Sequence, residues 1–288
     1  MKKMIFNFIF VIVVFVVALL SCTTSTTNGI TMTLSKSGEV MIYVAGSGAM
    51  TIDWGDRTKK ETHTLVIYEL GFDGIEYRYI HSYSNTFRHT ITIYGEKITH
   101  FCCSDNQLMS LDVSKNTSLV ELVCVNNQLT SLDVSKNTAL TRLACAKNHL
   151  KSLDVSKNVT LDFLDCGENH LKSLDVSKNE TLDFLACDEN HLTNLDVSTN
   201  SALESLWCND NQITSLDVSN NIVLTVLGCN SNQLSTATLD ALFGTLNNNT
   251  VSREKRIFIQ DNPGTDTCDR SIATEKGWRV ETILRYTE

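Results

Sequence analysis

The stretch from Leu129 to Leu150 reads LTSLDVSKNTALTRLACAKNHL, and a close copy of it follows at once. The consensus of the copies is L-x-x-L-x-C-x-x-N-x-L-x-x-L-D-V-S-x-N-x-x, with a constant period of 21 residues. Seven copies in the same register cover residues 98–235. A single coil of this length cannot bury its own apolar side. Successive coils therefore have to stack and share one continuous core.

Alternation within each copy predicts the local structure. Around Leu122-Val123-Cys124 it sends Leu122 and Cys124 inward and their neighbours outward, which is the pattern of a strand. The Leu-Asp-Val-Ser half of the unit also alternates, which predicts a second short extended segment on the opposite wall. Since so short a coil leaves little room for helices, we expect a mainly β solenoid with a parallel sheet along one face.

The first half of the unit resembles the leucine-rich-repeat pattern L-x-x-L-x-L-x-x-N/C-x-L, with cysteine in the third leucine place. The resemblance covers all seven copies and implies a leucine-rich-repeat solenoid of seven 21-residue coils.

The evenly spaced cysteines could be metal ligands, disulfide partners or redox groups, or they could simply fill the core. Metal ligands have to converge, and a straight file of side chains does not converge. Disulfides need Cβ atoms about 3.5–4.5 Å apart, whereas in-register strands hold equivalent side chains roughly 4.8 Å apart. Buried cysteine behaves as a small apolar residue. We therefore predict that the seven thiols fill the core, with a partial disulfide or redox role as the alternative. They are Cys103, Cys124, Cys145, Cys166, Cys187, Cys208 and Cys229.

Three polar columns accompany the repeat. Two asparagine columns, represented by Asn148 and Asn158, mark the turns, where a buried amide can satisfy backbone groups of its own and adjacent coils. An aspartate column, represented by Asp133, is expected to point outward and to bond turn amides, with calcium binding as the alternative. His149, His170 and His191 form a further column, and we expect them to stack at the edge of the solenoid.

The N-terminal segment has the marks of export. The basic start MKK precedes an apolar run that Asn7 alone interrupts, and a polar stretch follows. This order is typical of a signal peptide, with an uncleaved membrane anchor as the alternative. Leu19-Leu20-Ser21-Cys22 resembles the lipobox of bacterial lipoproteins. The resemblance implies a signal peptide at 1–21, lipidation of Cys22, and an exported lipoprotein held at the outer membrane or cell surface. Residues 22–29 are interpreted as a tether.

The flanks of the array lack its register. In residues 30–96 the segments GEVMIYVAG and HTITIYG alternate as strands. The stretch at 52–58, followed by 81–83 and 90–93, resembles the polycystic-kidney-disease (PKD) type β-sandwich, although Arg57 stands where glycine is usual. The resemblance implies a β-sandwich-like domain, or a smaller β cap on the solenoid. We interpret the acids and histidines here as turn and buried polar groups. Residues 236–288 predict a helix, a strand, a short helix and a last strand, which form a small α/β cap.

The outward positions of the L-x-C strands vary while the core positions do not. Three large aromatic residues, Phe163, Phe184 and Trp207, fall on consecutive coils and are expected to be exposed. Exposed aromatic residues beside acids on a rigid sheet suit a recognition surface, although they could instead cover one another or be covered by a terminal segment. The candidate binding residues are Glu121, Val123, Arg142, Phe163, Asp165, Phe184, Asp188, Trp207 and Asn209.

These observations favour recognition over catalysis. The sequence shows no nucleophile with a base, no phosphate-binding loop and no zinc spacing, so we expect no enzyme, cofactor or metal. The net charge of −9 excludes a basic nucleic-acid footprint. We expect a membrane-anchored, non-enzymatic recognition protein that binds a protein or glycan partner through the outer face of the solenoid, in adhesion or host–microbe interaction. The alternative is a structural or assembly scaffold of the cell envelope.

Overall fold

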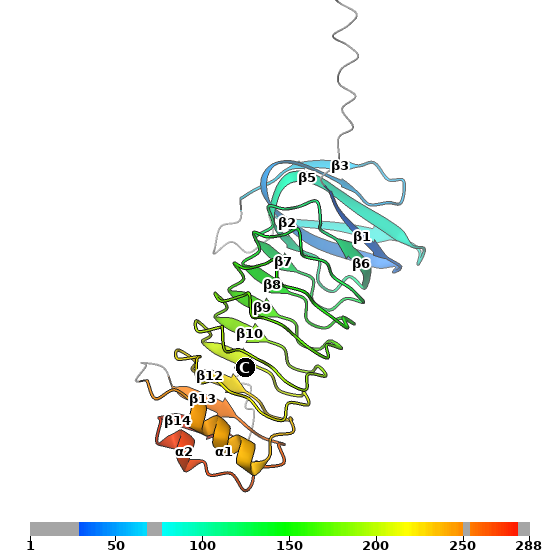
Figure 1. The fold of residues 1–288 in the computed structure, drawn as a ribbon. Coiled ribbons are helices and arrows are strands. Elements are labelled where there is room, and N and C mark those ends of the chain that lie inside the picture. The colour runs from blue at the N-terminus through cyan, green and yellow to red at the C-terminus, as the bar shows by residue number, and fades with distance from the viewer. Residues whose placement is uncertain (1–28, 68–76, 250–253, 282–288) are drawn as a thin grey trace, which may run out of the picture.

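The computed structural model describes residues 29–67, 77–249 and 254–281. The expected signal peptide, Cys22 and most of the expected tether lie outside this range. The chain forms a mainly β solenoid of about eight turns, as the repeat predicts. A single fourteen-stranded sheet runs along one wall of the solenoid and continues into the N-terminal region (Figure 1).

The N-terminal region and the first coil contribute six strands to this sheet: β1 (Gly29–Leu34), β2 (Gly38–Asp53), β3 (Glu61–Thr64), β4 (Arg78–Tyr83), β5 (His89–Cys102) and β6 (Leu108–Asp112). They pair antiparallel, with β2 between β4 and β5. The expected boundary between residues 96 and 97 falls inside β5, so the β region and the first coil share one strand. The likeness to the PKD-type sandwich stays a prediction.

Each later coil contributes one three-residue strand: β7 (Glu121–Val123), β8 (Arg142–Ala144), β9 (Phe163–Asp165), β10 (Phe184–Ala186), β11 (Ser205–Trp207) and β12 (Val226–Gly228). These strands are parallel and in register, with β5 pairing to β7 at the start. Equivalent outward side chains therefore form straight columns along the solenoid. This register is what positions the candidate site.

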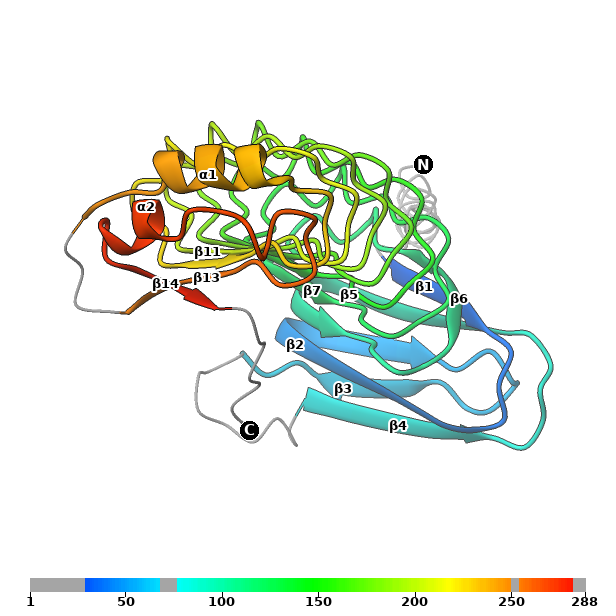
Figure 2. The same cartoon turned by 90° about the horizontal axis from the view of Figure 1, so that it is seen from below.

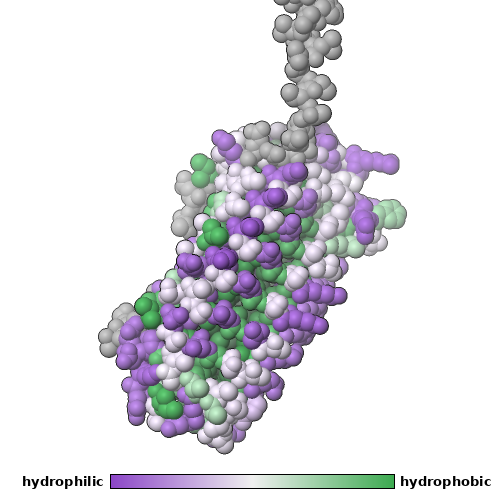
Figure 3. All heavy atoms as spheres, viewed as in Figure 1, coloured by the Kyte–Doolittle hydropathy of each residue, from purple (hydrophilic) through white to green (hydrophobic). Residues whose placement is uncertain are grey.

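The opposite wall differs from the expectation. The predicted alternation is present, since Val134 is fully buried and Asp133 is exposed. Within the described residues, however, only the first copy becomes a strand there, as β6. The physical reason is that β1 lies beside it and supplies an antiparallel partner. Viewed from the side that α1 covers, rows of hydrophilic residues follow the solenoid axis, with hydrophobic residues between them (Figure 3).

The cysteine file fills the core, as predicted. All seven repeat cysteines are fully buried and free. Burial raises the pKa of each of their thiols, which keeps them protonated. A protonated thiol can donate a weak hydrogen bond, and Cys166 Sγ lies 3.4 Å from the carbonyl oxygen of Ala186 in the next coil.

The first asparagine column ties each coil to the one before it. The Nδ2 of Asn148 donates to the carbonyls of Cys124, Cys145 and Ala146 at 3.0–3.1 Å, and its Oδ1 accepts from the N–H of Leu129. In the second column, Asn158 Nδ2 donates to two carbonyls, but its buried Oδ1 has no hydrogen-bond partner within the described residues. Asn148 in the first column therefore uses both its amide nitrogen and its amide oxygen in hydrogen bonds, whereas Asn158 in the second column uses only its nitrogen.

The other predicted columns take their expected places. The aspartates accept a hydrogen bond from the backbone N–H two residues on, as Asp133 does from Ser135 at 2.9 Å. The rings of His149, His170 and His191 stack at 5.6 and 5.9 Å between centroids, and they are exposed.

The C-terminal cap also follows the prediction: α1 (Thr236–Thr245), β13 (Lys255–Phe258), α2 (Ser271–Thr274) and β14 (Trp278–Glu281). The structure adds a turn that the period does not reveal, because α1 interrupts the repeat. Ile257-Phe258-Ile259 replaces the L-x-C strand, and Asn262 replaces the turn asparagine. Its Nδ2 donates to the carbonyls of Cys229 and Ile259 at 2.9 Å, so this turn is closed in the same way. Figure 2 shows α1 on the wall away from the strands.

The inequality of the two asparagine columns is testable. We expect Asn148→Ala to lower the free energy of unfolding by about 2–3 kcal/mol, because the N–H of Leu129 loses its acceptor and three buried carbonyls each lose one of their two donors. Asn158→Ala should cost less, since both carbonyls that it contacts keep a backbone N–H donor and an unsatisfied oxygen is removed. His149→Ala, which changes the exposed residue beside Asn148, is the matched control. Chemical denaturation measures all three, and equal losses for the two asparagines would contradict this account.

Candidate functional site on the strand face

The outward side of β5 and β7–β12, here called the strand face, carries the candidate binding residues. Register places Glu121, Arg142, Phe163 and Phe184 in one column, here called the first column. A second column holds Val123, Asp165 and Trp207. Asp188 and Asn209 each lie two residues past the end of a strand, β10 at Ala186 and β11 at Trp207. The sequence therefore brings all nine candidates to one face, but in separate columns.

The first column contains a continuous stack. The Phe163 and Phe184 rings are 4.5 Å apart between centroids and nearly parallel, at 5°. The Arg142 guanidinium carbon lies over the Phe163 ring, 4.2 Å from its centroid, and makes a cation–π contact. The same arginine is 3.7 Å from a carboxylate oxygen of Glu121. Both phenylalanines are half-buried, so the expectation of open exposure was wrong. The in-register spacing of the coils lets each ring cover its neighbour.

Trp207 belongs to a different arrangement from the two phenylalanines. It lies in the second column and stacks on Phe258 of the cap, with centroids 5.5 Å apart. Gly228 of the next coil makes room for it, because a Cβ there would lie 2.4 Å from the indole. Trp207 is half-buried for this reason, and the cap covers part of it. Asn209 is also buried, at 9% exposure, so it offers little surface to a partner.

Acidic side chains flank the phenylalanine stack on both sides. Asp162, Asp183 and Glu204 occupy consecutive coils immediately before the first column, linked by backbone hydrogen bonds of 2.9 and 2.8 Å. Burial, and then the charges of Asp162 and Glu204, raise the pKa of Asp183, while Arg142 lowers it. This row lies next to the predicted candidates but was not among them. Its signal in the sequence is the acid that precedes Phe163, Phe184 and Ser205.

On the other side of the stack lie Asp165 and Asp188. Burial raises the pKa of Asp165. Burial, and then the charges of Asp165, Glu189 and Glu168, raise the pKa of Asp188 to about 6. The Asp188 carboxylate lies over Gly167 of the preceding coil, where a Cβ would be 2.9 Å from its Oδ1. The glycine thus permits an acid to lie flat against the sheet at an electrostatic cost.

Val123 and Glu121 line a pocket of about 200 Å³ where the N-terminal strands meet the first coils. Tyr43 and Ala45 of β2 contribute its far wall, because β2 pairs with β5 beside the array. The sequence pattern did not reveal this wall, since the antiparallel pairing of β2 with β5 is long-range. In Figure 2, β2, β3 and β4 project on the strand side of the solenoid.

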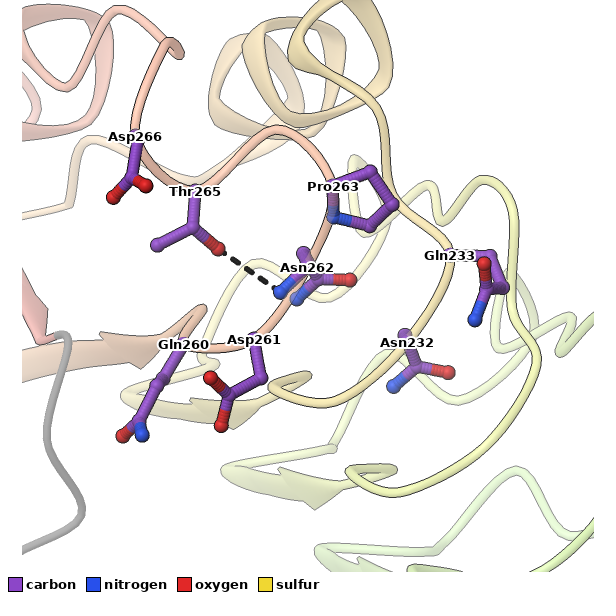
Figure 4. A pocket seen from close by; sticks show the side chains of 8 residues that line it. All are labelled: Asn232, Gln233, Gln260, Asp261, Asn262, Pro263, Thr265 and Asp266. Atoms are coloured by element: carbon purple, nitrogen blue, oxygen red, sulfur yellow. Dashed lines mark hydrogen bonds between the residues drawn. The ribbon is translucent and has the colours of Figure 1, made fainter.

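A larger polar hollow of about 540 Å³ lies at the turn edge beside the cap (Figure 4). Its lining includes Asn232 and Asn262, whose Nδ2 groups hold adjacent coils together. The Thr265 hydroxyl accepts from the N–H of Asn262 at 3.0 Å. These polar groups are engaged in closing the last turns. We therefore do not place the functional site there. Among the described residues, no cluster of three or more histidine, cysteine or acidic side chains has the geometry of a metal site.

The structure defines the class of fold: the chain is a mainly β solenoid of about eight turns. No family model matches the sequence, and no curated protein does. Similar solved structures include bacterial leucine-rich-repeat proteins. One is the functional domain of InlJ from Listeria monocytogenes, described as including a cysteine ladder, with 31% identity, TM-score 0.36, and coverage of 62% of this chain and 47% of that one.

Two further structures show the same likeness at lower identity. An internalin (InlF) from Listeria monocytogenes is 20% identical, with TM-score 0.48 and coverage of 64% of this chain and 60% of that one. A leucine-rich-repeat protein of Leptospira interrogans is 18% identical, with TM-score 0.40 and coverage of 59% and 56%. The matched part therefore spans 47–60% of the length of these three chains.

The raised pKa of Asp188 predicts a stabilising substitution. Because the folded state disfavours its carboxylate, the wild-type chain loses stability as the pH rises from about 4 to about 6 and that group ionises. Asp188→Asn should therefore raise the free energy of unfolding at pH 7 by about 1–2 kcal/mol after allowance for solvent screening. The gain should vanish near pH 4, where the aspartate is protonated.

Glu180→Gln, which removes an exposed carboxylate that does not act on Asp188, is the control and should change stability little. Thermal unfolding of the three proteins at both pH values makes the comparison. A gain that does not depend on pH would mean that ionisation of Asp188 is not its cause.

Proposed function

We propose that the chain is a membrane-anchored, non-enzymatic recognition protein whose strand face binds a protein partner. The observation that carries this proposal is the Phe163–Phe184 stack between two acidic rows on a rigid sheet. Aromatic residues at the centre of a surface, bordered by polar groups, are typical of binding hot spots. Asp188 is kept ionisable at a cost to stability, which is a pattern common at functional sites.

A protein partner fits the strand face better than a glycan. Sugars pack on the open faces of aromatic rings, but here Phe163 is covered by Arg142 on one face and by Phe184 on the other. One face of the Trp207 indole is covered by Phe258. The face therefore presents ring edges, one open end of the stack and charged groups, which match the side chains of a protein.

Attachment to a membrane rests on the N-terminal segment. Within the described residues no helix is long and apolar enough to cross a bilayer. Leu19-Leu20-Ser21-Cys22 lies outside them, and its likeness to a lipobox supports a lipid on Cys22. Several acyl chains on one residue give a firm anchor. The net negative charge of the chain opposes adsorption to anionic lipid, so the lipid supplies the attachment.

The strand face is tested by removing its aromatic side chains. We expect the triple variant Phe163→Ala, Phe184→Ala and Trp207→Ala to bind a partner, isolated by crosslinking to the wild-type chain, at least about tenfold more weakly. The control variant is Val159→Ala, Ile222→Ala and Val223→Ala, which removes exposed apolar residues from the turns and should bind normally. Titration calorimetry with the purified partner measures both. Normal binding by the triple aromatic variant would mean that the strand face is not the binding site.

Anchoring and surface exposure are tested together in cells. Wild-type chain should incorporate labelled palmitate, fractionate with membranes and be digested when intact cells are treated with protease. Cys22→Ala should lose the label and the membrane fraction. Protection of the wild-type chain in intact cells would instead favour the alternative, a scaffold inside the envelope.

A further inference from the structure

The stack on the strand face is closed at one end and open at the other. It begins with the guanidinium of Arg142, continues through Phe163 and ends at Phe184. The next coil places Ser205 in register with Phe184, and serine has no ring and no charge to cover it. Within the described part of the chain, Phe163 is the ring partner of Phe184, and no cation lies over its second face. A position equivalent to that of Arg142 is therefore left at Ser205.

The surroundings of this open end are acidic. Asp183 directly precedes Phe184, and Glu204 directly precedes Ser205. The backbone N–H of Glu204 donates to the carbonyl of Asp183 at 2.8 Å. Asp188 lies on the other side of the same coil. Burial and neighbouring negative charges raise the pKa of both Asp183 and Asp188, so these acids lack compensating cations of sufficient strength. A partner that brings positive charge to this point lowers the cost of ionising Asp183.

Nearby basic side chains of the chain itself are engaged elsewhere. Arg142 lies over Phe163, and Lys147 pairs with Glu168 at 3.0 Å. Arg256 and Arg279, further along the first column, lie 3.5 and 3.3 Å from carboxylate oxygens of Glu254. Within the described residues, none of these four cations is therefore left to balance the acids at the open end.

We propose that the open face of Phe184 above Ser205 binds an arginine side chain from a basic segment of the partner protein. The bound guanidinium stacks on Phe184 as Arg142 stacks on Phe163, while Asp183, the residue before Phe184, supplies a carboxylate beside it. A guanidinium is planar and stacks on aromatic rings, whereas the lysine ammonium is a compact and more strongly hydrated charge, so the site prefers arginine. This inference rests on the proposed function and adds that the partner protein carries an exposed arginine in a basic segment.

The test uses short fluorescein-labelled peptides and the purified chain. In the probe, arginine alternates with serine, and two matched peptides carry lysine or glutamate in place of arginine. Fluorescence polarisation at moderate salt measures binding. We expect the arginine peptide to bind at least about tenfold more tightly than the lysine peptide, because the stacking contact adds to the charge attraction. The glutamate peptide should not bind. High salt should weaken arginine binding, since the acids are partly exposed.

Variants locate the site. Ser205→Arg places the chain's own guanidinium against Phe184 and should abolish binding of the arginine peptide, whereas Ser205→Ala should leave it unchanged. Phe184→Leu keeps an apolar side chain but removes the ring, and it should reduce the preference for arginine over lysine. Asp183→Asn should weaken both cationic peptides, and Glu180→Gln, an equal loss of charge on an exposed turn, should not. Circular dichroism confirms that each variant is folded.

The outcomes separate this inference from the proposed function. Equal binding of arginine and lysine peptides, or arginine binding that survives Ser205→Arg, overturns the proposed site. So does failure of every peptide to bind. In each of these cases the proposed function still stands if the partner isolated by crosslinking loses affinity for the triple aromatic variant. If the partner binds that variant normally, the proposed function fails as well.

Discussion

The amide of one asparagine in every coil holds the solenoid together. In the middle of the array Asn148 Nδ2 bonds three carbonyls from two coils, and its Oδ1 bonds a backbone N–H of the preceding coil. A turn inside a stack is shielded from water, so these groups need protein partners. Because the same bonds recur at every coil, each coil has to keep the same length. That constraint produces the register of the sheet, and the register places every outward residue in a column.

The same constraint decides what the core contains. A narrow coil has room for leucine at most inward positions and for a smaller group beside them, and the buried free cysteines fill this place. Their thiols stay protonated because burial raises their pKa. Where α1 interrupts the period, the closing turn uses isoleucine in the cysteine position and keeps the asparagine. The amide is thus retained where the thiol is not, which identifies the hydrogen bonds as the stricter requirement.

On the outer face, the alignment of equivalent side chains in columns creates the candidate site and also lowers the stability of the fold. Rings in register stack, as Phe163 and Phe184 do, and they give a rigid surface with little loss of side-chain entropy on binding. Acids in register repel: burial and the charges of Asp162 and Glu204 raise the pKa of Asp183, while burial and other nearby acids raise the pKa of Asp188. Selection for stability alone favours an amide at that position. The acidic rows beside an open aromatic end are accordingly the feature that best distinguishes this surface from the rest of the solenoid.

The sequence by itself determined the solenoid, the inward cysteines, the turn asparagines and the choice of the strand face, because these depend on a period that each coil repeats locally. Only the tertiary structure decided which candidates act together. Phe163 stacks with Arg142 and Phe184, whereas Trp207 packs against Phe258 of the cap. It also added the pocket wall from β2 and the closing turn at Asn262. These features join residues that are distant in sequence or lie outside the period, so no repeating pattern could indicate them.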